Sequence, residues 1–277
     1  MASHALPSRS RPLARHLLAE LVSRQRTLAS YGGAMLGLAL VAVAMQSIDP
    51  RLLDNGVNVW VKPAKFFSSV GIFALTSAWF FGYVRPGRRR APMLRATAAM
   101  IVVAGTVELA WICWQAAHGL ESHFNNDTIF FSIMYSVMGL FAVLLVGTTL
   151  PLAWEIGRRP AAHLRTDFVA AVVIGLVLTF LLGGGLGGYM SAQPGHAMGL
   201  EGGHVPLFGW NRSGGDLRIA HFLGIHAEQG LPVLAAIVAG MASRVRWAVI
   251  LGGAVLYVVV TLAIFAQAVA GHPLLPL

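Results

Sequence analysis

Residues 128–152 read TIFFSIMYSVMGLFAVLLVGTTLPL, a run without any Asp, Glu, Lys, Arg or His. As a helix that rises about 1.5 Å per residue, such a run can cross the roughly 30 Å hydrocarbon core of a bilayer. It lacks the alternation of apolar and polar residues that marks a strand of an outer-membrane barrel. Because a backbone in lipid must satisfy its own hydrogen bonds, the stretch predicts a membrane-spanning α-helix.

The same pattern recurs along the whole chain. Of 277 residues, 56% are hydrophobic and 11% are charged, and the mean hydropathy of +0.69 exceeds that of a soluble domain with a polar surface. Apolar runs of comparable length lie at 28–47, 64–84, 94–117, 128–152, 168–190, 217–240 and 247–270. The sequence therefore predicts an all-α, polytopic membrane protein, a bundle of seven transmembrane helices in one domain.

The positive charges predict how these spans are oriented, because cytoplasmic loops of membrane proteins are enriched in Lys and Arg. With seven spans, the N-terminus and the loops at 85–93, 153–167 and 241–246 share one side of the membrane. Counted together with Arg95, at the start of the third run, that side holds 15 of the 20 basic residues, leaving Arg51, Lys62, Lys65, Arg212 and Arg218 for the other. We expect a protein of the cell's inner (plasma) membrane with a cytoplasmic N-terminus and an extracytoplasmic C-terminus.

The segment before the first span is basic. Residues 1–27 are predicted to be a cytoplasmic segment, and residues 28–277 the transmembrane domain. RHLLAELVSRQR, at residues 15–26, suits an interfacial helix that lies on anionic lipid. The alternative is a cleaved secretory signal ending near AVA at Ala42–Ala44, but the leader before the apolar run is longer than a usual signal allows.

Cysteine content and motifs exclude several classes of protein. Cys113 is the only cysteine, which excludes an intramolecular disulfide and any site built from several cysteines. The sequence contains no Walker A motif, no Rossmann glycine fingerprint and no G-x-S-x-G elbow. ATP-driven transport and serine hydrolysis therefore have no local support.

Glycines are concentrated at the end of the fifth run, where residues 183–188 read GGGLGG. The segment could be a hinge, or a packing seam in which Gly184 and Gly188 face a neighbouring helix. Gly33 and Gly37 in the first run have the same spacing, and small residues four apart let two membrane helices approach closely.

Polar side chains inside the predicted spans gather in the outer half of the membrane. Burying a charge in hydrocarbon is costly unless it is paired, so such residues are candidates for function. The third span and its following loop supply Glu108, Gln115, His118, His123 and Asn125. The sixth span supplies His221, His226, Glu228 and Gln229, and the second supplies Lys62 and Lys65. Together they predict one polar site near the outer surface.

Helical spacing constrains this site. Glu108, Gln115 and His118 fall at intervals of seven and three residues, so they form one stripe along the third span. His221 and His226 are five residues apart, and on a regular helix they diverge by about 140°. They cannot ligate one metal by themselves, so any set of ligands must combine the third and sixth spans.

Three functions fit such a site, and the sequence leaves them open. The first is a membrane redox protein in which His118 or His123, together with His221 or His226, binds a haem b or a divalent metal. The partners would be the lipid bilayer and this cofactor or a small molecule, and nothing points to nucleic acid.

The second function is a transporter or binding protein for a small polar solute, with Glu108 as a proton-coupled carboxylate. Its candidate substrate-binding residues are Lys62, Lys65, Gln115, Asn125 and Gln229. The third is a zinc hydrolase, with three of the histidines on the metal and Glu108 or Glu228 as general base. A purely structural explanation stands beside them, in which Glu108 pairs with Lys65 and each histidine satisfies a loop carbonyl.

Two segments resemble known sequences. GGDLRIAHFLGIHA, from Gly214 to Ala227, and QAAHGLESHFN, from Gln115 to Asn125, resemble segments of bacterial inner-membrane proteins without an assigned function. The resemblance covers a small part of the chain. It implies a multi-pass inner-membrane protein but no activity, cofactor or site.

Overall fold

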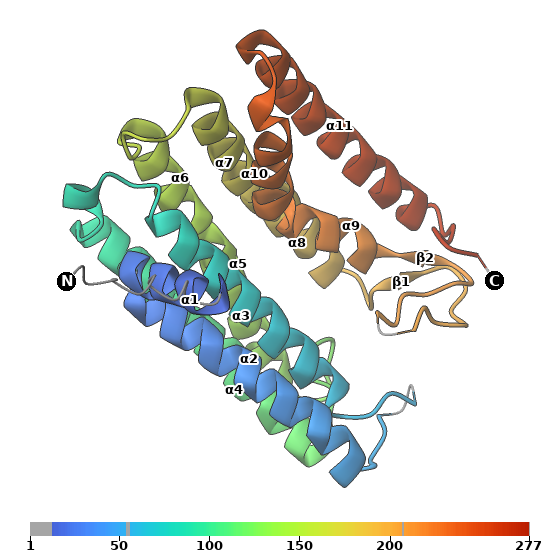
Figure 1. Ribbon diagram of the computed structural model, residues 1–277. Coiled ribbons are helices and arrows are strands. Elements are labelled where there is room, and N and C mark those ends of the chain that lie inside the picture. The colour runs from blue at the N-terminus through green and yellow to red at the C-terminus, as the bar shows by residue number, and fades with distance from the viewer. Residues whose placement is uncertain (1–12, 54–55, 207, 277) are drawn as a thin grey trace, which may run out of the picture.

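A computed structural model describes residues 13–53, 56–206 and 208–276. Within these residues the chain is mostly helical. The long helices lie side by side with their axes roughly aligned (Figure 1). Among the described residues, six helical segments are long and apolar enough to cross a membrane, and a bent pair of helices makes a seventh crossing if it counts as one span. The prediction of an all-α, polytopic architecture is confirmed.

The first four helices form the amino-terminal part of the bundle. The short helix α1 packs against α2 and α3, and α3 connects to α4 through a 3-10 turn, η1. Their bounds are α1 Leu13–Arg24, α2 Arg26–Ile48, α3 Val61–Phe81, η1 Pro86–Arg88 and α4 Pro92–His118. α4 begins with a proline in its first turn. Gly119 follows its last residue and caps the helix with a φ of 72°, which favours glycine.

The remaining helices contain most of the irregular backbone. The fourth span is α5 followed by α6, and the fifth is α7, a π-helix η2, and α8. The bent pair is α9 and α10, and the last span is α11. Their bounds are α5 Ile129–Gly147, α6 Thr149–Arg158, α7 Thr166–Leu178, η2 Thr179–Gly184, α8 Gly185–Ser191, α9 Leu217–Ile225, α10 Ala227–Ile237, η3 Val238–Gly240 and α11 Ser243–Val269.

The long loop between α8 and α9 is held by a small hairpin. Strand β1 (Ala197–Met198) pairs antiparallel with β2 (Gly215–Asp216), with Ala197 opposite Asp216. Both strands lie beside the end of α11 (Figure 1). The loop is therefore anchored to the last span rather than free.

The seven predicted runs agree with the helices of the structure. Each run lies on one helix or on one continuous series of helices. The largest difference is in the fourth run, which was expected to end at residue 152 but extends through α6 to Arg158. Polar residues such as Glu155 end the apolar run without ending the helix, which explains this difference.

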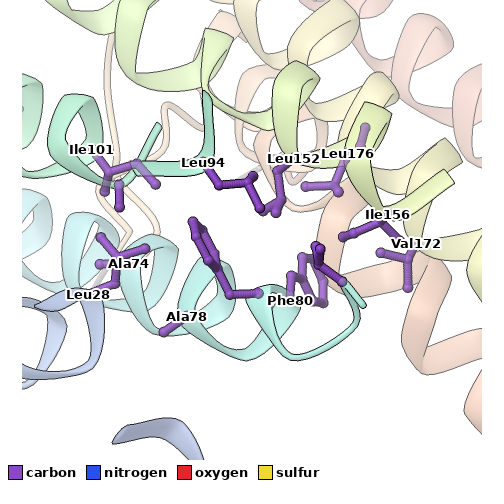
Figure 2. Packing of buried hydrophobic residues seen from close by; sticks show 14 of the residues in the cluster. Leu28, Ala74, Ala78, Phe80, Leu94, Ile101, Leu152, Ile156, Val172 and Leu176 are labelled. Carbon is purple, nitrogen blue, oxygen red and sulfur yellow. The ribbon is translucent and has the colours of Figure 1, made fainter. Parts of the chain in front are cut away.

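Buried side chains of five helices join the two parts of the bundle. Figure 2 shows this packing, which brings together α2, α3, α4, α6 and α7. Its labelled members are Leu28, Ala74, Ala78, Phe80, Leu94, Ile101, Leu152, Ile156, Val172 and Leu176. In lipid such contacts stabilise helix association by close packing rather than by removal of apolar surface from water.

The outer surface of the bundle is strongly apolar, most clearly along α5. Only 6% of its most apolar window is buried inside the chain. Large side chains on α5 are exposed: Ile129, Phe130, Ile133, Leu140 and Val143. A continuous apolar surface of this kind is unfavourable in water and is typical of a helix that faces lipid.

Buried acidic residues at the arginine-rich end of the bundle are all paired. Glu155, fully buried, accepts hydrogen bonds from Arg88 Nε at 2.8 Å and from Arg159 Nη1 at 3.1 Å. Asp167 forms ion pairs with Arg165 and with Arg246 on α11. These pairs fix the loops that connect the spans on this side.

The close glycine contacts differ from the predicted ones. The four glycines that were predicted to form seams make no such contact. An added Cβ on any of them would meet nothing within 4 Å in this chain: Gly33, Gly37, Gly184 and Gly188. The close approaches are made by their neighbours instead. A Cβ on Gly32 would lie 2.9 Å from the Gly71 carbonyl oxygen, and one on Gly183 would lie 2.8 Å from Ile225 Cγ2. The pairs Gly33 with Gly37 and Gly184 with Gly188 therefore make no close contact within this chain, because local helix rotation cannot be read from glycine spacing alone.

Candidate functional site

The predicted polar residues divide into two groups. We call Thr76, Thr179, His226, Glu228 and Gln229 the helix-break cluster, because they surround the junction between α9 and α10. A second group lies at the end of the bundle opposite the arginine-rich loops, which we call the outer end, among the start of α3, α4 and the loop that follows α4. We call Lys62, Glu108, Gln115, Glu121 and His123 the outer cluster.

The helix pair α9 and α10, which covers the predicted sixth span, is bent at His226. α9 begins at Asp216, whose carboxylate accepts a hydrogen bond from the Arg218 N–H at 3.0 Å and so caps the helix. The two helices meet at an angle of 54°, and His226 has φ −97° and ψ 6°. Pro232 lies inside α10 and has no N–H, so the helical hydrogen bond to the Glu228 carbonyl is missing. The regular helix assumed for His221 and His226 therefore does not exist.

A threonine of the neighbouring span stabilises this break. Thr179 lies about midway along the fifth span, at the start of the π-helix η2. Its Oγ1 accepts a hydrogen bond from the Glu228 N–H at 3.0 Å and donates one to the Ile225 carbonyl at 3.5 Å. The hydroxyl thereby satisfies backbone groups on both sides of the junction.

Glycines allow the two irregular segments to touch. An added Cβ on Gly224 would lie 2.7 Å from the Gly183 nitrogen, and one on Gly175 would lie 2.8 Å from the Ala227 carbonyl oxygen. Real Cβ atoms essentially never approach so closely, so these positions need glycine unless the backbone moves. The break in one span and the π-helix in the other therefore form a single packed unit.

Glu228 is the acidic residue of the helix-break cluster, and it is fully buried. Its relative exposure is 0%, and it lies about midway between Leu217 and Gly240 along the bent span. Oε1 accepts a hydrogen bond from Gln229 Nε2 at 2.9 Å, whereas Oε2 is buried and has no hydrogen-bond partner. An acidic oxygen in this state needs a proton, a cation or a bound donor.

Gln229 connects this carboxyl to another part of the bundle. Its Nε2 also donates to Thr76 Oγ1 on α3 at 3.2 Å, and its Oε1 lies 3.2 Å from His226 Nδ1. Because Gln229 Oε1 is an acceptor, the His226 ring donates through Nδ1. A chain of hydrogen bonds therefore runs from α3 through Gln229 to Glu228.

His221 is held by the π-helix rather than by the outer cluster. Its Nδ1 donates to the Gly183 carbonyl oxygen at 3.0 Å, and its ring lies against Gly187. An added Cβ on Gly187 would lie 2.9 Å from His221 Cε1. This histidine therefore fixes the π-helix against α9.

The outer cluster is built on one buried face of α4. Glu108, Trp111 and Gln115 follow one another at intervals of three and four residues, and all three are buried. Trp111 Nε1 donates to the Ser122 carbonyl oxygen at 3.0 Å, and Gln115 Nε2 donates to the Glu121 carbonyl oxygen at 3.1 Å. These two bonds fix the loop after α4 against the helix.

Two acceptor oxygens in this cluster are buried without partners. They are Glu108 Oε1 and Gln115 Oε1, and the exposures of these residues are 3% and 1%. The Lys62 ammonium at the start of α3 interacts electrostatically with Glu121 and with Glu108. The purely structural alternative, in which Glu108 pairs with Lys65, is wrong on this point, because Lys65 Nζ instead donates to the Phe208 carbonyl oxygen at 2.8 Å.

The two histidines near the end of α4 have separate surroundings. His118 is exposed, stacks on Trp114 and donates through Nδ1 to the Trp114 carbonyl oxygen at 2.8 Å. His123 lies against Phe66, with its Nδ1 3.1 Å from Ser122 Oγ. Burial, reinforced by the Lys62 charge, lowers the pKa of His123 to about 3, so its ring is neutral at physiological pH.

The loop between β1 and β2 bridges the two halves at the outer end. Arg218 donates through Nη2 to the Gly209 carbonyl oxygen at 2.6 Å and also pairs with Asp216. Burial alone would raise the pKa of Asp216, but the hydrogen bonds and charge of Arg218 hold it below its usual value. Lys65 on α3 binds the carbonyl oxygen of the preceding residue, Phe208. One segment of the loop therefore contacts both α3 and α9. Asn125 lies in the loop after α4 and donates to the Glu121 carbonyl oxygen of that loop at 3.4 Å.

The structure does not gather the four candidate histidines into one metal site. Within residues 13–53, 56–206 and 208–276, no group of three or more His, Cys, Asp or Glu side chains is placed to hold a metal ion. Among the hydrogen bonds and ring contacts of the described residues, none joins His118 or His123 to His221 or His226. The donor set therefore does not fit a three-ligand zinc centre.

Some members of these clusters carry no signal in the sequence. Thr76 and Thr179 are ordinary residues of apolar spans, and hydroxyl side chains there usually bond their own helix. Pro232 was the one available sign of irregular backbone in the sixth span. Comparisons with protein-family models, with curated proteins and with solved structures found no match.

Proposed function

We propose that the chain is a transporter or binding protein for a small polar solute, and that Glu228 is its proton-binding carboxyl. One observation carries this proposal: Glu228 Oε2 is buried without a partner, midway along a membrane-spanning segment. Ionisable groups in the membrane interior are costly, and they commonly mark pathways for ions, protons or substrates.

The irregular backbone around Glu228 supports the same proposal. Secondary transporters commonly bind substrates and coupling ions near the bilayer midplane, at discontinuous helices. Non-helical backbone is tolerated at that depth where protein buries it or where it lines a cavity. Here a broken span meets a π-helix, and π-helical turns occur frequently at functional sites.

The hydrogen bonds of Gln229 suggest how proton binding could be coupled to movement. A protonated Glu228 is neutral and is tolerated in its buried position. Loss of the proton leaves a carboxylate that needs additional donors, and Gln229 Nε2 is the donor already in contact. A shift of Gln229 toward Glu228 weakens its bond to Thr76, which releases α10 from α3. We propose this exchange as the step that links the proton to the two parts of the bundle.

We further propose seven spans in the inner membrane, with α9 and α10 together forming the sixth and with a cytoplasmic N-terminus. The distribution of basic residues supports this orientation. The loops on the proposed cytoplasmic side carry Arg85, Arg88, Arg89, Arg90, Arg158, Arg159, Arg165, Arg244 and Arg246. On this topology the outer cluster and the β1–β2 loop lie on the extracytoplasmic side.

Charge movement in reconstituted membranes tests the transport proposal. Full-length protein in proteoliposomes on a solid-supported sensor would receive pulses of diamines, amino acids, organic acids and polyols at different pH values. We expect a proton-dependent current with one of these classes. Glu228→Gln keeps the size of the side chain but cannot release a proton, so the current should fall about tenfold or more.

Glu201→Gln is the matched control, because Glu201 is exposed in the outer loop. It should leave the current unchanged. A parent protein that gives no current with any class would overturn the transport proposal. So would a Glu228→Gln variant that is reconstituted equally well and keeps the same pH-dependent current.

A redox protein is the second candidate, and one observation favours it. His118, His221 and His226 each engage Nδ1 in a hydrogen bond, which leaves Nε2 available. This is how ligating histidines are usually oriented. The separation of these histidines into two groups ranks this candidate below transport. A Soret band in the absorption spectrum of the purified protein would reverse the ranking.

A further inference from the structure

The buried face of α4 carries two acceptors that nothing in the described chain satisfies. Glu108 Oε1 and Gln115 Oε1 are both without a hydrogen-bond partner, and both residues are more than nine-tenths buried. Burying a polar oxygen without a donor is unfavourable. Two such oxygens on one helix face therefore indicate a ligand that supplies donors.

The orientation of Gln115 shows that its free oxygen is not an accident of side-chain rotation. Its Nε2 is held by the Glu121 carbonyl oxygen, and the adjacent Ser122 carbonyl oxygen is held by Trp111 Nε1. Exchanging the two ends of the amide would place an oxygen against the Glu121 carbonyl oxygen, so the amide is fixed with Oε1 free.

The cations near the outer cluster leave Glu108 Oε1 without a donor. Lys62 interacts with two carboxylates, those of Glu121 and Glu108. Neither interaction supplies a hydrogen bond to Glu108 Oε1, which is buried without a partner. Arg218 is also near Lys62, but it is already paired with Asp216 at 2.5 Å.

The surroundings of Trp111 suit an organic cation. Trp111, Ile112 and Met138 form a buried cluster against which Phe66, Phe131 and Met134 pack. The Trp111 and Phe131 ring centroids are 6.2 Å apart. Aromatic faces attract ammonium groups, and methionine side chains adapt to the shape of what they contact.

We propose that the face of α4 formed by Glu108, Trp111 and Gln115 binds a small organic ammonium compound that has a second N–H or O–H donor. The ammonium group binds at Glu108, and the second donor binds Gln115 Oε1. The two residues lie about 10 Å apart along the helix axis, so one ammonium group cannot serve both acceptors. This names a substrate class for the proposed transporter, although binding itself does not require transport.

Three linear compounds with the same four-carbon chain test the proposal on the purified full-length protein. Putrescine ends in ammonium groups, 1,4-butanediol in hydroxyls and succinate in carboxylates. We expect only putrescine to raise the thermal unfolding temperature in detergent. Glu108→Gln should weaken the apparent affinity for putrescine about tenfold or more, and Gln115→Ala should weaken it to a smaller extent.

Two further variants keep the test decisive. Glu201→Gln should bind putrescine like the parent. If Glu108→Gln does not fold, Glu108→Asp retains the carboxylate and should still respond to putrescine. The proposal is overturned if putrescine has no effect on the parent, if butanediol or succinate stabilises it equally, or if Glu108→Gln responds unchanged. Binding without any transport current would keep this site and reject the transporter, and a current without putrescine binding would do the reverse.

Discussion

Thr179 is the residue on which the broken span most directly depends. Its hydroxyl accepts from the Glu228 N–H and donates to the Ile225 carbonyl, so it replaces hydrogen bonds that a continuous helix would have made. The sequence predicted the carboxyl and amide groups of this cluster because such groups are rare in apolar spans. It did not predict Thr179, because a single hydroxyl in an apolar span is common and has no distinctive spacing.

Replacing this hydroxyl should destabilise the protein in a specific way. Thr179→Val keeps the shape of the side chain but leaves the Glu228 N–H buried without a partner, which should lower the free energy of unfolding by about 1–3 kcal/mol. Thr179→Ser keeps the hydroxyl and should lose much less. Thermal unfolding of both variants in the same detergent measures the difference. Equal stability of Thr179→Val and the parent would show that the hydroxyl does not support the break.

At the scale of elements, the most informative difference between sequence and structure is the sixth span. Residues 217–240 were predicted as one helix, but in the structure they form the pair α9 and α10, which is bent by 54° at His226. Pro232 alone would not have located the break, because it lies inside α10 and not at the junction. The position of the break depends on the π-helix of another span, and such a tertiary contact leaves no local pattern.

Gly224 in α9 and Gly184 in η2 should differ in how substitution by alanine changes the stability of the protein. Gly224→Ala would place a Cβ 2.7 Å from the Gly183 backbone nitrogen, so one of the packed segments must move. We expect a loss of about 1–3 kcal/mol in the free energy of unfolding, as for other overpacked interiors. Gly184→Ala meets nothing within 4 Å, and it should be neutral or slightly stabilising in a helix. If calorimetry found the two variants equally stable, the contact between α9 and η2 would be wrong.

At the scale of the whole molecule, the positions of the long apolar helices followed from the sequence with little error. Apolar length and arginine-rich loops are properties of single segments, so they can be read without knowing the neighbours. The arrangement of the site could not be read this way. Lys62, Glu108 and Gln115 were predicted to share one site with His221 and His226, but Gly183 and Gln229 bind the two histidines instead.

The proposed orientation predicts which loops are accessible from outside. In a Cys113→Ala background, Glu201→Cys places a thiol in the loop between β1 and β2, and Gly87→Cys places one in η1. A membrane-impermeant maleimide should label the first in intact spheroplasts and the second only after the membrane is disrupted. Labelling of both thiols in intact spheroplasts, or of Gly87→Cys alone, would contradict the orientation.

The π-helix η2 also has a consequence for the ancestry of the fold. A π-helical turn accommodates one residue more than an α-helical turn, so it is the usual trace of a single inserted residue in an older helix. Without that residue, the outer part of the fifth span would be rotated by about 100° relative to its inner part. The Gly183 carbonyl would then no longer face His221, and Thr179 could not keep its position while α8 kept its own. A homologue that has lost this one residue should therefore also have changed His221, Gly224 and Glu228, so the four features should be inherited together or lost together.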